Sequence, residues 1–251
     1  MNQDAKDYAR EEQAKVLYEK GWGEQLGITP FAEYLKTIPE IPLWPLEWAA
    51  RFDQTILVDA RLGVSQICSK LGVLNADTSD DQIFDFDSSK AMTDPVYWIN
   101  CHDGQHNRCK TFVEYQNNWG ADEVCLNVYE GLCFFAQNRL VLSRHYLDFP
   151  GSTYLFESGK EEIGERVTKM FAKGSLLVEQ FQGDFESCIN LLMQNGFSRA
   201  EALRNLAEVT RNGDMACISL HLYLGQPSLF VHPDAALPKF GAPIRGVYSK
   251  K

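Results

Sequence analysis

One stretch of the sequence gathers more polar and reactive side chains than any other: YWINCHDGQHNRC, residues 97–109. It contains two of the five His and two of the seven Cys residues of the chain. Asp-Gly between two arms with apolar flanks is typical of a type I′ turn. We therefore expect a β-hairpin that turns at Asp103-Gly104, and this hairpin is the starting point for both fold and function.

The expected hairpin decides whether its Cys and His residues can bind a metal. Cys101, His106 and Cys109 are zinc ligands by residue type, but their spacing differs from that of common zinc sites. Side chains alternate along a strand, so Cys101 is expected to face His106 while Cys109 faces Trp98 on the other side. Three ligands do not converge in this arrangement, and we predict no metal site.

Catalysis by Cys101 and His106 is one functional interpretation of the stretch. With Asp103 nearby, the two residues supply the types of a Cys-His-Asp arrangement, in which an imidazolium activates a thiolate. A cysteine in the middle of a strand lacks the backbone amides that stabilise an oxyanion. The enzyme, a Cys/His-dependent hydrolase or transferase, is therefore kept as the alternative hypothesis.

Binding is the interpretation that we favour for the polar turn. Polar loops on a rigid scaffold often carry function, so Asp103, Gly104, Asn107 and Arg108 are predicted to recognise a partner or a small polar ligand. The competing structural interpretation is that Asp103 and Asn107 satisfy backbone groups of the turn and Arg108 pairs with a surface carboxylate.

Composition limits the class of protein. The chain has 251 residues, of which 45% are hydrophobic and 23% charged, which is ordinary for a globular protein. A net charge of −10 disfavours nucleic acid as a partner. No apolar run approaches the ~20 residues of a membrane span, no signal peptide is evident, and an odd cysteine count fits reduced thiols in the cytoplasm. No nucleotide-binding motif appears, and we expect no cofactor.

Periodicity and turn residues predict the elements of the chain. Residues 1–45 are expected to form an N-terminal helical arm with a proline-rich connector, and residues 46–251 a single α+β domain with a small mixed sheet and flanking helices. The expected helices cover residues 4–20, 30–36, 64–70, 121–138 and a helical hairpin at 184–212. Strands are expected at 55–58, 174–181 and 218–224, with an edge strand after the acidic loop of 75–87. A turn is expected at 148–151, and residues 227–251 are expected to wrap over the surface.

Two resemblances to known families accompany these predictions. Asp103-Gly104-x-x-Asn107, together with the preceding Pro95–Trp98 and with Leu147–Ser152, resembles uncharacterised bacterial proteins that are grouped as a domain of unknown function; this resemblance implies no activity. Residues 184–224, with Gly196-Phe197 after a helix, are similar to ubiquitin-associated three-helix domains. That similarity implies a partner-binding loop at Phe197, although the expected third helix alternates like a strand here.

Together these observations predict a cytoplasmic binding or accessory protein of the α+β class. The recognition residues are predicted to be Asp103, Gly104, Asn107 and Arg108, with Phe197 as a further contact.

Overall fold

The computed structural model describes residues 3–75, 80, 83–85, 94–110, 114–115, 122–155, 193–194, 215–232 and 239–246. These residues form the mixed α+β fold that was predicted, and their strands make two sheets where one small sheet was expected. The strand predicted at 174–181 and the helical hairpin predicted at 184–212, with its Gly196-Phe197 loop, lie outside the described residues.

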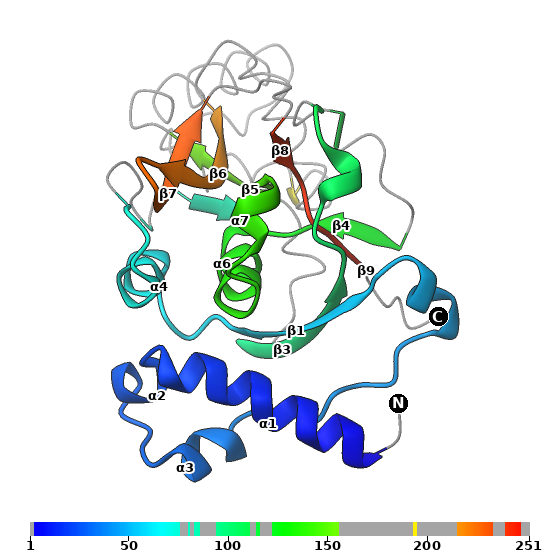
Figure 1. The fold of residues 1–251 in the computed structure, drawn as a ribbon, viewed down its shortest axis with the longest axis vertical. Coiled ribbons are helices and arrows are strands. Elements are labelled where there is room, and N and C mark those ends of the chain that lie inside the picture. The colour runs from blue at the N-terminus through cyan, green and yellow to red at the C-terminus, as the bar shows by residue number, and fades with distance from the viewer. Residues whose placement is uncertain are drawn as a thin grey trace.

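Three helices at the N-terminus lie together on one side of the first strand (Figure 1). They are α1 (Gln3–Glu19), α2 (Trp22–Gln25) and α3 (Phe31–Lys36). Helix α1 confirms the predicted helix, and it ends before Gly21, whose φ of 96° few other residues adopt. Helix α3 begins one residue later than predicted, since Pro30 is its N-cap. The proline-rich connector then leads to a 3₁₀ turn, η1 (Leu46–Ala50).

The first sheet has the strand order β1-β3-β9-β4, with every neighbouring pair antiparallel. Its strands are β1 (Gln54–Asp59), β3 (Val96–Cys101), β4 (Glu123–Cys125) and β9 (Ile244–Gly246). Strand β1 confirms the strand predicted at 55–58. Its residues Ile56 to Asp59 are all buried, because the N-terminal helices and α6 (Val128–Gln137) pack around it (Figure 1).

The hairpin predicted at Asp103-Gly104 is wrong. Cys101 pairs with Gln54 of β1 on one side and with Arg245 of β9 on the other, so no neighbour position is left for the segment after the turn. The chain instead enters a 3₁₀ turn, η3 (Gln105–Asn107). Residues 105–109 are polar, whereas the residues of β9 and the central residues of β1 are buried, and their burial favours pairing of β3 with these distant strands.

The second sheet has the order β2-β5-β6-β7, with a short strand β8 parallel to β5. Its strands are β2 (Ile83–Asp85), β5 (Tyr146–Leu155), β6 (Met215–Tyr223), β7 (Gln226–His232) and β8 (Phe240–Gly241). Strand β2 lies at the edge of the sheet, but it falls within residues 75–87, the segment predicted as a loop, whereas the edge strand was predicted to follow that loop. Strand β6 confirms the predicted strand at 218–224.

The turn predicted at residues 148–151 is also wrong, because β5 continues through this segment with a register shift between Asp148 and Thr153. Such an irregularity accommodates Pro150, which cannot donate to a regular ladder. A Cβ on Gly151 would lie 2.7 Å from the backbone nitrogen of Asn127 and from the carbonyl oxygen of Cys125. Glycine therefore lets β5 pass close to the end of β4.

Helix α6 lies at the centre of the molecule, between β1 and β5 (Figure 1). It is shorter than the predicted helix, because residues 123–125 form β4 and Asn127 is the N-cap. The Asn127 side chain accepts from the Glu130 amide at 2.8 Å, and Glu130 accepts from the Asn127 amide at 3.1 Å. Residues 130–136 are all buried, as expected of a helix surrounded by other elements. Helices α4 (Val64–Leu71), which confirms the prediction for 64–70, and α7 (Val141–Arg144) complete the described helices longer than one turn.

The C-terminal segment does not wrap over the surface as predicted. Strand β9 lies inside the first sheet, between β3 and β4, and Ala242, Ile244 and Arg245 are buried. A three-residue strand carries too little periodicity to be seen in the sequence, and pairing with β3 and β4 stabilises it. No helix in the described part of the chain is long and apolar enough to cross a membrane.

Candidate functional site

The segment from His102 to Cys109, called the 102–109 loop below, connects β3 to the rest of the chain. Asp103 holds it in place from below: its Oδ1 accepts from the Gln105 amide at 2.9 Å, and its Oδ2 lies 3.2 Å from Arg144 Nη1. Buried His145 donates through Nε2 to the Asp103 carbonyl oxygen at 2.8 Å. Asp103 is therefore mainly an anchor of the loop and presents little surface to a ligand.

Gly104 and Asn107 attach the loop to the C-terminal segment. Gly104 has a φ of 85°, and a Cβ there would lie 2.5 Å from the backbone of Ala242. Asn107 donates through Nδ2 to the Ala242 carbonyl oxygen at 3.3 Å, and its own carbonyl oxygen accepts from the Tyr115 hydroxyl at 2.8 Å. These two predicted recognition residues thus fix the backbone of the loop.

The exposed tip of the loop consists of Gln105, His106, Arg108 and Cys109. Arg108 forms a β-bridge with Gly241 and donates through Nε to the Gln105 carbonyl oxygen at 3.2 Å. Of the four recognition residues predicted in this loop, Arg108 is the one whose side chain is exposed. Phe197, the fifth predicted contact, lies outside the described residues.

The structure does not place Cys101 opposite His106. Cys101 is fully buried at the end of β3, and this burial raises the pKa of its thiol well above the ordinary value. His106 lies in η3 with an exposed side chain. A thiol that stays protonated at neutral pH is a poor nucleophile, so the geometry gives little support to a Cys101-His106 catalytic pair.

Cys109 does not face Trp98 either. It follows the tip of the loop with a φ of 63°, and its amide donates to the Phe240 carbonyl oxygen at 3.3 Å. Within the described ranges, no three His, Cys, Asp or Glu side chains gather as a metal site needs.

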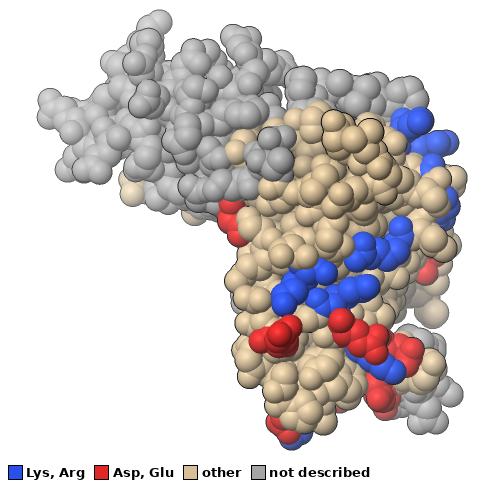
Figure 2. Space-filling model, turned by 60° about the vertical axis from the view of Figure 1, so that its left-hand side comes forward, with Lys and Arg blue, Asp and Glu red and all other residues tan. Residues whose placement is uncertain are grey.

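Two cations that sequence reasoning missed lie beside the loop. Arg144 ends α7 and reaches Asp103, and exposed Lys239 immediately precedes β8. They come close because β5 and β8 pair in parallel at Tyr146 and Phe240, and because Tyr146 donates its amide to the Lys239 carbonyl oxygen at 2.8 Å. No local pattern reveals this proximity, since Lys239 lies 131 positions after Arg108 along the chain. On the face drawn in Figure 2, several Lys and Arg side chains lie near one another, with Asp and Glu side chains beside them.

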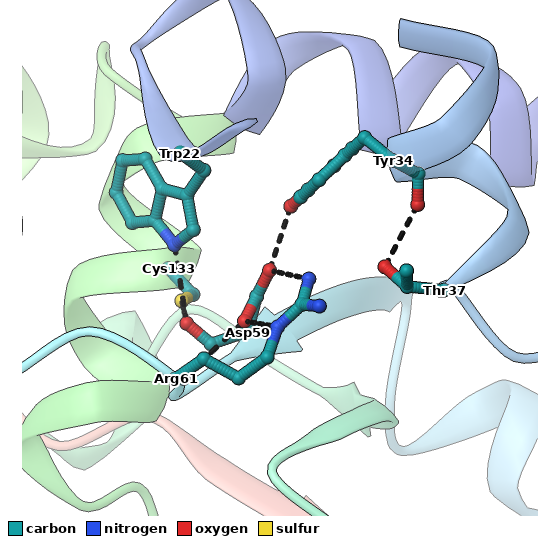
Figure 3. Close-up of polar contacts among 6 residues, drawn as sticks. All are labelled: Trp22, Tyr34, Thr37, Asp59, Arg61 and Cys133. Carbon is teal, nitrogen blue, oxygen red and sulfur yellow. Dashed lines mark hydrogen bonds and ion pairs between the residues drawn. The ribbon is translucent and has the colours of Figure 1, made fainter. Parts of the chain in front are cut away.

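A second polar cluster, which sequence reasoning also missed, surrounds Asp59 at the end of β1 (Figure 3). The fully buried carboxylate accepts from the Tyr34 hydroxyl at 2.7 Å and from Arg61 Nε at 2.8 Å and Nη2 at 2.6 Å. Trp22 donates to the Asp59 carbonyl oxygen at 3.1 Å. Burial, followed by the nearby Asp59 charge, raises the pKa of Tyr34, so its hydroxyl stays protonated as the donor.

The Asp59 cluster joins two helices of the N-terminal arm to the sheet. Tyr34 comes from α3 and Trp22 from α2, while Arg61 follows β1 and lies over the Tyr34 ring at 5.5 Å. Its hydrogen bond with Asp59 raises the pKa of Arg61, so the guanidinium remains charged. Because each polar group in the cluster contacts another member of it, we assign the cluster a structural role.

A third cluster is buried between α6, β3 and β9. Arg245 Nε lies 2.7 Å from Glu130 Oε1, and both side chains are almost completely buried. The N–H of Nε is not directed along this line, so the contact is an ion pair without a well-formed hydrogen bond through that atom. The Tyr97 hydroxyl donates to the same carboxylate at 3.1 Å, and burial raises the pKa of Tyr97.

The fold and the three clusters define an α+β protein with an anchored polar loop and two buried charge networks. Comparison of the chain with protein families, curated proteins and solved structures gave no match in any of the three.

Proposed function

We propose that the protein is a cytoplasmic binding or accessory protein that recognises its partner through the 102–109 loop. The observation that carries the proposal is the contrast within this loop. Hydrogen bonds and close packing hold Asp103, Gly104 and Asn107 against the rest of the protein, whereas Gln105, His106 and Arg108 are exposed. A loop that is already ordered loses little conformational entropy on binding, so its polar side chains can contribute to affinity.

The cytoplasmic location is supported by the cysteines. Cys68, Cys101, Cys109, Cys125 and Cys133, those that the structure describes, are all free thiols. Free thiols of this number are typical of a reducing compartment.

The experiment is affinity purification of the tagged protein from its native host. The test variant combines Gln105→Ala, His106→Ala and Arg108→Ala, which removes exposed side chains and keeps the anchors of the loop. Lys36→Ala is the control, because Lys36 is exposed on α3 and its ion pair in the described part of the chain is with Glu33 at 2.7 Å. We expect the triple variant to lose at least one partner that both the wild type and Lys36→Ala retain.

A partner profile that is identical for all three proteins would contradict the proposal. Circular dichroism and thermal unfolding should show that the triple variant is folded, because none of the three side chains is buried. Asp103→Ala is a poor test of recognition, since it removes contacts to Gln105 and Arg144 and changes the loop itself.

A further inference from the structure

The chemistry of the partner can be inferred from the charges around the 102–109 loop, an inference that rests on the proposed function. Three exposed cations from separate parts of the chain belong to this region: Arg108 in the loop, Arg144 against Asp103, and Lys239 next to Phe240, whose carbonyl oxygen accepts from the Cys109 amide. The bridge between Arg108 and Gly241 and the pairing of β5 with β8 bring their backbones together. The tertiary fold therefore brings these three backbone positions together, and the strand contacts hold them there.

The two arginines lie on either side of Gln105. Arg108 Nε donates to the Gln105 carbonyl oxygen, while Arg144 contacts Asp103, whose other carboxylate oxygen accepts from the Gln105 amide. Arg108 uses Nε alone in this contact, and its two terminal nitrogens have no hydrogen-bond partner among the residues that the structure describes. The guanidinium group is thus positioned by its inner nitrogen and keeps its outer donors for a ligand.

The local charge is opposite to that of the whole chain. Arg144 has an ion pair with Asp103, whereas neither Arg108 nor Lys239 has a carboxylate within ion-pair distance in the described part of the structure. Lys239 Nζ lies 5.9 Å from the Tyr146 ring. A guanidinium with two free terminal nitrogens matches the two oxygens of a carboxylate in a bidentate pair.

We propose that the 102–109 loop, with Arg144 and Lys239, binds a carboxylate-rich segment of another protein. The exposure of Gln105, His106 and Arg108 favours a protein segment, because small ligands are usually enclosed in concave pockets whereas protein interfaces are rich in exposed arginine. A net charge of −10 opposes nucleic acid, whose phosphates extend beyond the patch. Screening beyond about 8 Å at physiological salt lets a short acidic segment sense mainly the nearby cations.

The test is fluorescence anisotropy with the full chain and a fluorescein-labelled hexaglutamate peptide, with hexaglutamine as the neutral peptide. At physiological ionic strength, where screening limits repulsion by the rest of the chain, we expect hexaglutamate to bind and hexaglutamine to bind at least about fivefold more weakly. Arg108→Gln should weaken hexaglutamate binding about fivefold, and Arg108→Gln with Lys239→Gln further, whereas Arg108→Lys should retain part of the affinity. Lys36→Gln, which removes the same charge elsewhere, should leave binding unchanged.

Three results would overturn the inference: equal binding of the two peptides, equal loss with Lys36→Gln and Arg108→Gln, or tighter binding of a hexathymidylate oligonucleotide than of hexaglutamate. If the host partner still depends on the loop while hexaglutamate does not bind, the proposed function stands and the carboxylate inference fails. If neither depends on the loop, both fail.

Discussion

Cys101 and Cys109 lie eight positions apart, yet their surroundings give the two thiols different chemistry. Cys101 has no exposed surface, and burial raises the pKa of its thiol well above the usual value. Cys109 is exposed beside Arg108. Reactivity at a cysteine depends on access and on the fraction of thiolate, and burial lowers both for Cys101.

Alkylation of the native protein should therefore be selective. Iodoacetamide at neutral pH is expected to modify Cys109 first among the described cysteines, while Cys68, Cys101, Cys125 and Cys133 stay unmodified until the chain unfolds. Burial raises the pKa of Cys68 and of Cys133 to about 12, which adds to their protection. Peptide mapping by mass spectrometry with and without urea measures this order. Labelling of Cys101 as fast as Cys109 would restore the case for the Cys101-His106 enzyme.

At Asp59 a single carboxylate satisfies both a guanidinium and a phenol. Asp59→Asn removes the charge and leaves Arg61, whose side chain is 18% exposed, without its anion. Breaking a buried ion pair from one side is costly, so we expect the free energy of unfolding to fall by about 3 kcal/mol in urea denaturation.

The exposed pair of Lys36 and Glu33 is the matched control for Asp59. Glu33→Gln should change the free energy of unfolding by less than about 0.5 kcal/mol, because solvent screens exposed ion pairs. A loss for Asp59→Asn no larger than this would show that the Asp59 cluster does not secure the N-terminal arm.

At the scale of elements, β1 lies at the edge of the first sheet, and side-chain amides form hydrogen bonds with its outer backbone groups. The Gln13 amide of α1 donates to the Thr55 carbonyl oxygen at 2.6 Å and accepts from the Leu57 amide at 2.8 Å. Gln137 of α6 donates to the Leu57 carbonyl oxygen at 2.8 Å. Two side-chain amides thus occupy hydrogen-bonding groups that a further strand would use, which protects the edge from pairing with another chain.

Gln13→Ala should destabilise the protein through this edge. The change leaves the Thr55 carbonyl oxygen without its partner and leaves the Leu57 amide with a longer contact to Gln137, at 3.3 Å. We expect a loss of about 1–2 kcal/mol in urea denaturation, the usual cost of a partly buried unpaired group. Glu12→Ala, at the exposed neighbouring position on α1, is the control, and an equal effect of the two changes would contradict the role of the Gln13 amide.

At the scale of the whole molecule, the C-terminal segment connects the two sheets. Strand β9 joins β3 to β4, and β8 adds to the other sheet, so residues 239–246 contribute to both sheets. The same segment supplies Arg245 to the buried carboxylate of Glu130 and supports the loop through Ala242. Sheet, central helix and candidate site therefore depend on eight residues near the end of the chain.

Arg245→Met tests this dependence. The change leaves Glu130 buried without its cation, and we expect the free energy of unfolding to fall by about 3 kcal/mol. Adding Glu130→Gln should recover part of the loss, because a neutral amide costs less to bury than a carboxylate. Arg51→Met, at an exposed arginine paired with Asp122, should cost less than about 1 kcal/mol. Two results would contradict a stabilising role of the Arg245–Glu130 pair. One is an equal loss of unfolding free energy for Arg245→Met and Arg51→Met, and the other is a double variant that is no more stable than Arg245→Met.

Local patterns in the sequence predicted the elements whose own residues determine them. Helix α1 follows from its periodicity and the glycines after it, α4 from its apolar face and Gly72, and β1 from a run of β-forming residues. Helix α6 was predicted too long, because residues 123–125 have helical periodicity but pair with β9. The sequence singled out the 102–109 loop by its polar residues, but the hairpin predicted for it was wrong, and its role in recognition stays a prediction.

The sequence by itself determined the α+β class, the helices and strands with strong periodicity, and the segment in which we place the candidate recognition residues. The tertiary structure alone decided that β3 pairs with β1 and β9, that Asp103 anchors the loop while Arg108 remains exposed, and that Arg144 and Lys239 join it. The physical reason is the range of the interactions. Helical and turn preferences act over a few residues, whereas strand pairing and charge clustering join positions far apart, and burial of the whole core selects among them.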